Sequence, residues 1–278
     1  MKKHKFLRAA DTVITHSTLI VVSLIFLFPC LWLILASFSK SGSIYTYKGF
    51  FPSEYSLDTF KTLFTDTAMY NYPQWFMNTL QIAVFSSLIG TFLVILTAYT
   101  MSRFQFKSRK KIMKGTLILG MFPSFMGMIA VYIIMTQFGL INKIWGVILI
   151  YSSSAPMGYL TQKGFFDTVP FSIDEAAKID GATNFQIFLK INLPLSKPMI
   201  VYTALTSFTF PWSDFILPKL LLKEKDLYTV AVGLMNLGET EFSRFAAGSV
   251  FIAVPIVILY FILIRYMISG MTAGAVKG

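Results

Sequence analysis

The sequence is poor in charged and reactive side chains. Charged residues make up 13% of its 278 residues, whereas hydrophobic residues make up 55%, which is too apolar for a globular surface. The single cysteine, Cys30, lies in an apolar run, so no disulfide can form within the chain. With only His4 and His16, histidine-based metal or triad chemistry has almost nothing to work with. We therefore expect no metal site and no catalytic centre.

Two further absences narrow the function. The sequence has no Gly-Lys-Ser/Thr phosphate loop, so it lacks the usual cradle for ATP. Its net charge of +11 does not indicate nucleic-acid binding, because the basic residues flank apolar runs and no zinc-finger, helix-turn-helix or RNA-binding signature accompanies them. We expect a protein that is not an enzyme, needs no cofactor and binds no nucleic acid.

Long apolar runs are what the sequence has instead. A hydrocarbon core about 30 Å thick needs about 20 apolar residues as a helix. Six stretches approach this length: Val13–Phe38, Thr79–Ser102, Gly115–Gln137, Ile144–Leu160, Pro198–Leu217 and Phe245–Ile268. The first is too long, and too polar at its end, for a cleavable signal peptide. The pattern predicts an all-α bundle of six transmembrane helices.

The lysines and arginines orient this bundle. Most of the 24 fall at the amino terminus, in the connections 103–114 and 163–197, and in the tail. Because cationic loops are retained in the cytoplasm, both termini are predicted to be cytoplasmic. The chain then divides into a cytoplasmic segment 1–12, a membrane domain 13–268 that includes the cytoplasmic loop 163–197, and a cytoplasmic tail 269–278.

The loop 163–197 carries helix-capping signals. Ser172 followed by Glu175 predicts a capping box that starts a short helix, and Gly181 suits the left-handed residue that ends it. Thr183 with Gln186 repeats the capping box. We expect two short helices with a bend at residues 181–183, lying outside the membrane.

The first of these helices is suited to contact a partner. Ala176 and Ala177 form a small-residue surface into which another protein can pack closely. Charges surround that surface, from Asp174, Glu175, Lys178 and Asp180. A surface linker without a partner is the alternative that composition alone leaves open.

This segment resembles the EAA loop of binding-protein-dependent ABC transporter permeases. The resemblance rests on Glu175-Ala176-Ala177, Gly181 and Ile191-x-Leu193-Pro194. In that family the loop is a coupling helix that docks in a cleft of a separate ATPase. The residues that the resemblance assigns to ATPase coupling are Glu175, Ala176, Ala177, Asp180, Gly181 and Ala182.

The similarity covers most of the chain from about Asn78 onward and is to the MalG-like permeases of carbohydrate importers. Further matching segments are Met121–Pro123, Lys163–Thr168, Leu193–Pro198, Phe245–Gly248 and Thr272–Gly278. The resemblance implies the fold of type I (MetI-like) importer permeases in a bacterial cytoplasmic membrane. It also implies a MalF-like second permease, two copies of an ATPase and an extracytoplasmic sugar-binding protein. Similarity to permeases for maltodextrins and galacto-oligosaccharides favours malto-oligosaccharide as the substrate, moved by alternating access.

Trp212 and Asp214 are the candidate residues of a substrate path. An acid beside an aromatic ring near the end of a span offers the chemistry that sugars require. Asp214 can equally be a hydrated or capping acid, and Trp212 can belong to an interfacial aromatic belt with Trp75 and Trp145. Sugar contacts can also lie mainly in the partner permease.

The connection between the fifth and sixth spans is short, which leaves the reach of that loop into a binding protein open. Its polar part, Lys223–Arg244, is expected to face that protein. A carrier driven by an ion gradient is the alternative function, but the spans offer few acids or bases to couple an ion. A membrane receptor or scaffold would not need the docking loop.

Overall fold

The computed structural model describes residues 2–40, 42–47, 49–153 and 156–275. Within these ranges the regular structure is helical apart from one isolated β-bridge between Ser39 and Tyr55. The chain divides into two compact units, residues 1–70 with 234–251 and residues 71–233 with 252–278. The expected all-α class is confirmed.

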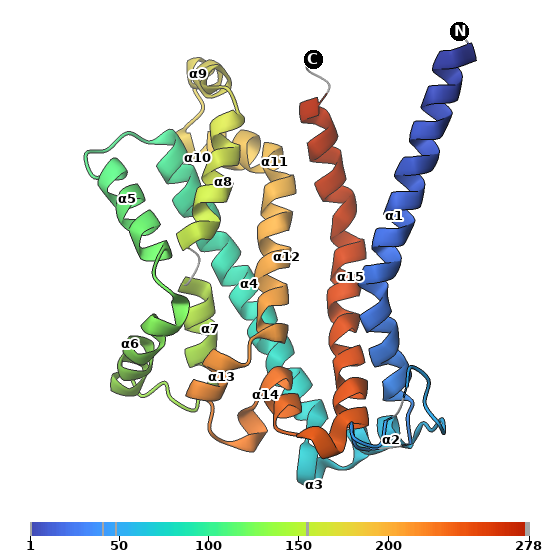
Figure 1. Cartoon of the computed structure of the whole chain (residues 1–278). Helices are drawn as coiled ribbons and strands as arrows, with labels where there is room; N and C mark the ends of the chain where they lie inside the picture. Colours follow the sequence, from blue (N-terminus) through green and yellow to red (C-terminus); the bar gives the residue numbers. More distant parts are fainter. Residues whose placement is uncertain (1, 41, 48, 154–155, 276–278) are drawn as a thin grey trace. The chain divides into compact units, whose positions relative to one another are not determined.

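The first unit begins with the long helix α1 (Lys2–Ser37), drawn in blue in Figure 1. The short helices α2 (Asp58–Thr65) and α3 (Thr67–Tyr70) follow, and η3 (Glu239–Glu241) and the first part of α15 (Phe242–Ala275) complete the unit. Its core joins the end of α1 to the start of α15 through Ala36, Phe242 and Ala246.

The second unit is built around α4 (Tyr72–Arg103), which packs against α7, α8 and α12. The sequence of α4 favours this central place, because small residues interrupt its apolar run. Gly90 lies against Ser152 of α7, where even an added Cβ atom would make only an ordinary contact with the Cα atom, at 3.6 Å. The remaining elements are α5 (Arg109–Gly120), α6 (Ser124–Gln137), α7 (Ile144–Ser153), α8 (Pro156–Thr168), α9 (Phe171–Ile179), α10 (Asn184–Ile187), η1 (Phe188–Asn192), α11 (Leu193–Leu195), α12 (Lys197–Ser213), α13 (Ile216–Leu221), η2 (Lys225–Leu227), α14 (Val230–Met235) and the rest of α15.

Within the described residues, three helices are each long and apolar enough to cross a membrane, namely Asp11–Ser37, Tyr72–Arg103 and Glu239–Met267. The apolar stretch 115–137 is not one straight helix. There α5 ends at Gly120, α6 begins at Ser124, and the two helices are bent by 106°. Pro123 between them has no N–H to continue a helical ladder and keeps an extended conformation, with ψ of 126°.

The expected fifth span is also divided, and the described residues of the fourth fall in two helices. In the fourth, α7 ends at Ser153 and α8 begins at Pro156, and the two residues between them lie outside the described part of the chain. In the fifth, α12 ends at Ser213 and α13 begins at Ile216. Hydropathy located these apolar segments but not the breaks within them.

Candidate functional site

The predicted coupling segment consists of α9 and the bend that follows it, at one end of the second unit (Figure 1). Helix α9 begins at Phe171 after Pro170, two residues earlier than a Ser172 cap requires. Ser172 therefore lies inside the first turn, and no side chain caps the helix. The expected Ser172–Glu175 capping box is wrong, because an extended proline already starts the helix.

The end of α9 is as predicted. Gly181 has a φ of +84°, its N–H donates to the carbonyl of Lys178 at 3.0 Å, and the N–H of Ala182 donates to the carbonyl of Ala177 at 2.9 Å. These two bonds form a Schellman motif, which favours glycine at the left-handed position.

The second capping box is confirmed. The Thr183 N–H donates to Oε1 of Gln186 at 2.8 Å, and the Gln186 N–H donates to Oγ1 of Thr183 at 3.3 Å. The bend between α9 and α10 therefore has defined bonds on both sides.

The two faces of α9 differ sharply. Asp174, expected among the surface charges, is instead buried. On the outward face, Ile179 is 87% exposed. The six predicted coupling residues lie along this helix and its end: Glu175, Ala176, Asp180 and Gly181 are exposed, and Ala177 and Ala182 are half-buried.

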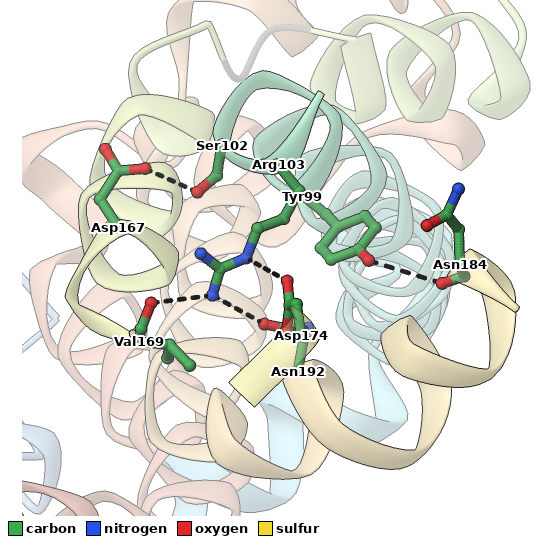
Figure 2. A network of polar contacts seen from close by, with 8 residues as sticks. All are labelled: Tyr99, Ser102, Arg103, Asp167, Val169, Asp174, Asn184 and Asn192. Carbon is green, nitrogen blue, oxygen red and sulfur yellow. Dashed lines mark hydrogen bonds and ion pairs between the residues drawn. The ribbon is translucent and has the colours of Figure 1, made fainter. Parts of the chain in front are cut away.

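A buried ion pair holds the inner face of α9 (Figure 2). Nε of Arg103, the last residue of α4, lies 3.1 Å from Oδ2 of Asp174, and the two side chains are only 4% and 8% exposed. Arg103 also donates to the carbonyl of Val169 and to Oδ1 of Asn192, both at 3.0 Å. Asn192 in turn donates to Oδ1 of Asp174 at 2.9 Å. One guanidinium thus joins the end of α4 to α9, to the link before it and to η1.

Sequence reasoning missed this network. Arg103 was interpreted only as one of the cytoplasmic cations that orient the bundle. Its position at the end of an apolar run was the available signal. The pairing partner could not be read from that signal, because it lies on a distant segment.

A second polar contact adjoins the network. The Ser102 hydroxyl donates to Oδ1 of Asp167 at 2.6 Å, and Lys163 pairs with the other carboxylate oxygen (Figure 2 shows the serine contact). Partial burial opposes ionisation of Asp167, but the hydrogen bonds from Lys163 and Ser102 outweigh it and lower the pKa of this carboxyl below its usual value. The end of α8 is thereby tied to the end of α4.

The two predicted substrate-path residues are not brought together. Trp212 is 1% exposed and packs against Phe76 and Phe208, with ring centroids 5.1 and 6.0 Å apart. Asp214 follows the end of α12, where its Oδ2 accepts a hydrogen bond from the Tyr151 hydroxyl at 2.8 Å. Its Oδ1 accepts from the Ile216 N–H at 3.0 Å. Trp212 is thus a packed ring within this chain, whereas Asp214 is a local cap that also positions Tyr151.

Among the residues that the structure describes, no three His, Cys, Asp or Glu side chains gather closely enough to hold a metal ion.

The comparisons with known proteins agree with this geometry. Residues 90–273 match the family model of the binding-protein-dependent transport system inner membrane component. The chain belongs to this family and is a multi-pass protein of the cytoplasmic membrane.

Two relatives extend the match over the whole chain. It is 36% identical to the galactooligosaccharides transport system permease protein GanQ of Bacillus subtilis, with 100% of this chain and 99% of that protein covered. It is 37% identical to the maltodextrin transport system permease protein MalD of Streptococcus pneumoniae, with 99% and 98% covered. The predicted similarity to MalG-like permeases is confirmed.

A solved structure shares the fold. The bacterial ABC transporter that imports the acidic polysaccharide alginate has a chain that superposes with a TM-score of 0.76 at 19% identity, covering 93% of this chain and 96% of that one. The likeness shows that the two chains share the same fold over most of their length.

Proposed function

We propose that this chain is the permease subunit of an ATP-binding-cassette importer that moves malto-oligosaccharide across the cytoplasmic membrane by alternating access. The family and the maltodextrin relative support this function. Galacto-oligosaccharide is the second candidate substrate, because the relative named for it is almost as similar. A carrier driven by an ion gradient is not favoured by membership of a binding-protein-dependent family.

The proposed complex contains a MalF-like second permease, two copies of an ATPase and an extracytoplasmic sugar-binding protein. The outward face of α9 is the observation that supports ATPase docking. Three large apolar residues of α9 are exposed outside the apolar spans, namely Phe171, Ile173 and Ile179, the last by 87%. Exposed apolar residues gathered on one short helix favour a surface that a partner protein covers. The buried Asp174 on the opposite face fixes which side of α9 is presented. In this arrangement, Glu175 and Asp180 supply acids beside the apolar contact.

A pair of tryptophan variants tests docking. Ala176 is exposed on α9, so Ala176→Trp adds bulk to the proposed contact without disturbing the inner face. Ser108→Trp adds the same bulk to another exposed site in a loop predicted to be cytoplasmic. We expect Ala176→Trp to abolish co-purification of the ATPase and uptake of maltotriose by reconstituted complexes, and Ser108→Trp to leave both unchanged. If the two variants gave the same ATPase co-purification and the same uptake, α9 would be a surface linker and not a docking helix.

Six spans with both termini in the cytoplasm complete the proposal. Within the second unit, the carboxyl end of α15 and α9 lie at the same end (Figure 1), and the Lys197 ammonium lies 4.1 Å from the centre of the Tyr266 ring. Single cysteines in a Cys30→Ser background test the orientation. We expect cysteine at Ser108 or Ser172 to be shielded from an impermeant thiol reagent in intact cells, and cysteine at Ser53 to react. Labelling of Ser108→Cys from outside would reverse the topology.

The loop before α15 is proposed to face the binding protein. In the second unit, Lys223–Asp226 is exposed, whereas Thr229, Val230 and Val232 are buried. The exposed charges are therefore the part available to a partner. Reversing Lys223 and Lys225 to glutamate should weaken binding-protein docking while ATPase assembly is kept. Unchanged docking would make this loop a connector.

A further inference from the structure

A cavity of about 390 Å³ lies among α4, α7, α8 and α12 in the second unit. Its volume falls within the range of about 300–1,000 Å³ that small-molecule sites occupy. The predicted path residues Trp212 and Asp214 do not line it. The side chains that define its chemistry are Ser86, Tyr151, Thr203, Tyr202, Thr206 and Phe210.

The sequence of α12 places a polar, aromatic stripe on this cavity. Tyr202, Thr206 and Phe210 are spaced four residues apart, so they share one face of the helix. Phe208 and Trp212 pack on another side, in a cluster with Ala83. The helix therefore has a dry side turned to α4 and a side rich in hydroxyl groups turned to the cavity.

The hydroxyl groups of this wall are ready to accept hydrogen bonds. Those of Thr206 and Ser86 donate to the carbonyls of Tyr202 at 3.0 Å and Ile82 at 2.6 Å. Thr203 donates in the same way to the carbonyl of Met199 at 2.9 Å. Their protons are engaged by the backbone, which leaves oxygen lone pairs for a ligand that donates, as sugar hydroxyls do.

An aromatic edge stands beside these acceptors. The rings of Tyr151 and Phe210 meet edge to face, with centroids 5.3 Å apart and planes at 86°. The Tyr151 hydroxyl is held by Asp214, so this ring is fixed from outside the cavity. Aromatic rings pack well on the apolar faces of sugars, and the fixed geometry reduces the cost of ordering them on binding.

A buried donor lies behind the same wall. Gln162 is fully buried, and its Oε1 is 3.4 Å from the Thr203 hydroxyl. Its amide nitrogen has no hydrogen-bond partner within the described part of the chain. Gln162 does not line the cavity itself, but its Oε1 accepts from the Thr203 hydroxyl and so helps to orient that side chain of the wall.

We propose that this cavity binds one residue of a neutral oligosaccharide as it crosses the membrane, so that this subunit contacts the sugar itself. The proposal rests on the proposed importer function. None of the described side chains that line the cavity is charged. Such a wall suits an uncharged sugar better than a uronic acid, whose carboxylate would need a cation.

A matched pair of threonine variants tests the site. Thr206→Val keeps the side-chain shape and removes the hydroxyl. Thr209→Val makes the same change on the same helix, where the hydroxyl also donates to a carbonyl one turn earlier, at 2.8 Å, but Thr209 does not line the cavity. The complexes are reconstituted with the partner permease, the ATPase and saturating binding protein, and maltotriose and galactotriose are the probes.

The readout is sugar taken up per ATP hydrolysed. One lost hydrogen bond between neutral groups predicts about a two- to tenfold decrease in this ratio for Thr206→Val. Thr209→Val should change neither this ratio nor basal ATP hydrolysis. Thr206→Ser keeps the hydroxyl and should take up sugar as the wild type does, and the same loss in Thr206→Ser as in Thr206→Val would contradict a role for this hydroxyl. Equal uptake by both valine variants would overturn the cavity site while the importer function stands. A wild-type complex that takes up neither sugar would overturn both.

Discussion

The two ends of α4 are fastened to the rest of the second unit by opposite kinds of chemistry. At its amino end, Asn78 donates to the carbonyls of Asp226 at 2.7 Å and Tyr228 at 3.0 Å, and the Thr79 hydroxyl accepts from the Val230 N–H at 2.8 Å. At its carboxyl end, the guanidinium of Arg103 is buried against a carboxylate of α9. Neutral side chains bound to backbone groups hold one end, and a buried pair of charges holds the other.

The difference teaches what each end is built to do. Neutral hydrogen bonds contribute about 0.5–1.5 kcal/mol each, and backbone acceptors fix one geometry. A buried ion pair adds little net stability, because desolvation offsets the attraction, yet losing one partner costs about 3–5 kcal/mol. The carboxyl end therefore specifies where α9 lies more than it stabilises the bundle.

Removing the guanidinium should give the largest effect. Arg103→Met leaves Asp174 buried without a cation and should lower the free energy of unfolding by about 3–5 kcal/mol. The double variant Arg103→Met/Asp174→Leu should recover most of this loss but not the coupling of ATP hydrolysis to uptake. Unfolding in mixed detergent micelles measures the first quantity and proteoliposome assays the second. A double variant with normal coupling would show that the pair does not set the position of α9.

At the amino end of α4, adding a methyl group to Gly233 should disrupt the packing around Trp75. A Cβ atom on Gly233 would lie 2.0 Å from Cε3 of Trp75, whose indole N–H donates to the carbonyl of Lys225 at 2.8 Å. Gly233→Ala should therefore lower the free energy of unfolding by about 1–3 kcal/mol. Gly164→Ala, where nothing lies within 4 Å of the added atom, is the matched control in the same unit. Equal costs at the two glycines would contradict the tight packing at Trp75.

Asn78→Leu measures the neutral bonds themselves. It leaves two carbonyls without their donor and should cost about 1–3 kcal/mol. The residues 78 and 103 are about 37 Å apart along an ideal helix, so this cost should add to that of Arg103→Met within about 0.5 kcal/mol. Strong non-additivity in unfolding measurements would show that the two ends are not independent.

The smallest effect is a pH dependence at the carboxyl end. The pKa of Asp167 is lower in the folded protein than its usual value, so the stability it contributes is present above about pH 4 and is lost as the pH falls through the lower, folded pKa. The carboxylate side chain is 41% exposed, which limits the contribution to under about 1 kcal/mol. Asp167→Asn should flatten the pH profile of unfolding in this range, and an unchanged profile would assign the slope to other carboxyls.

Hydrogen bonds between residues close in sequence could be predicted, whereas contacts between distant segments could not. Gly181 and the Thr183–Gln186 capping box were found from sequence because their bonds join residues within one turn. The Ser172–Glu175 box failed although its pattern was equally good, because the helix starts two residues earlier, after Pro170. Composition cannot reveal which of two valid starts the chain uses.

The candidate sites show the same limit. The family resemblance assigned ATPase coupling to residues of α9 and the bend after it, which stays a prediction. It could not show the burial of Asp174, which is paired with Arg103 on a distant segment of the chain. Trp212 and Asp214 were chosen for their chemistry, whereas the cavity is lined by Thr206 and Phe210 on another side of α12. The side of α12 that meets the cavity is set by its packing on α4, which a single sequence does not report.

The bend after α9 has a mechanical consequence. The Schellman bonds at Gly181 and the capping box at Thr183 leave few free torsions between α9 and α10, so this connection is stiff where an ordinary loop would be compliant. A stiff connection transmits a displacement of α9 instead of absorbing it. The inner face of α9 is also paired with the end of α4, through Asp174 and Arg103. In the proposed complex, a flexible insertion such as Gly-Ser after Ala182 would therefore uncouple the two subunits. ATP hydrolysis would continue, but movement of the ATPase would no longer be transmitted to the membrane helices.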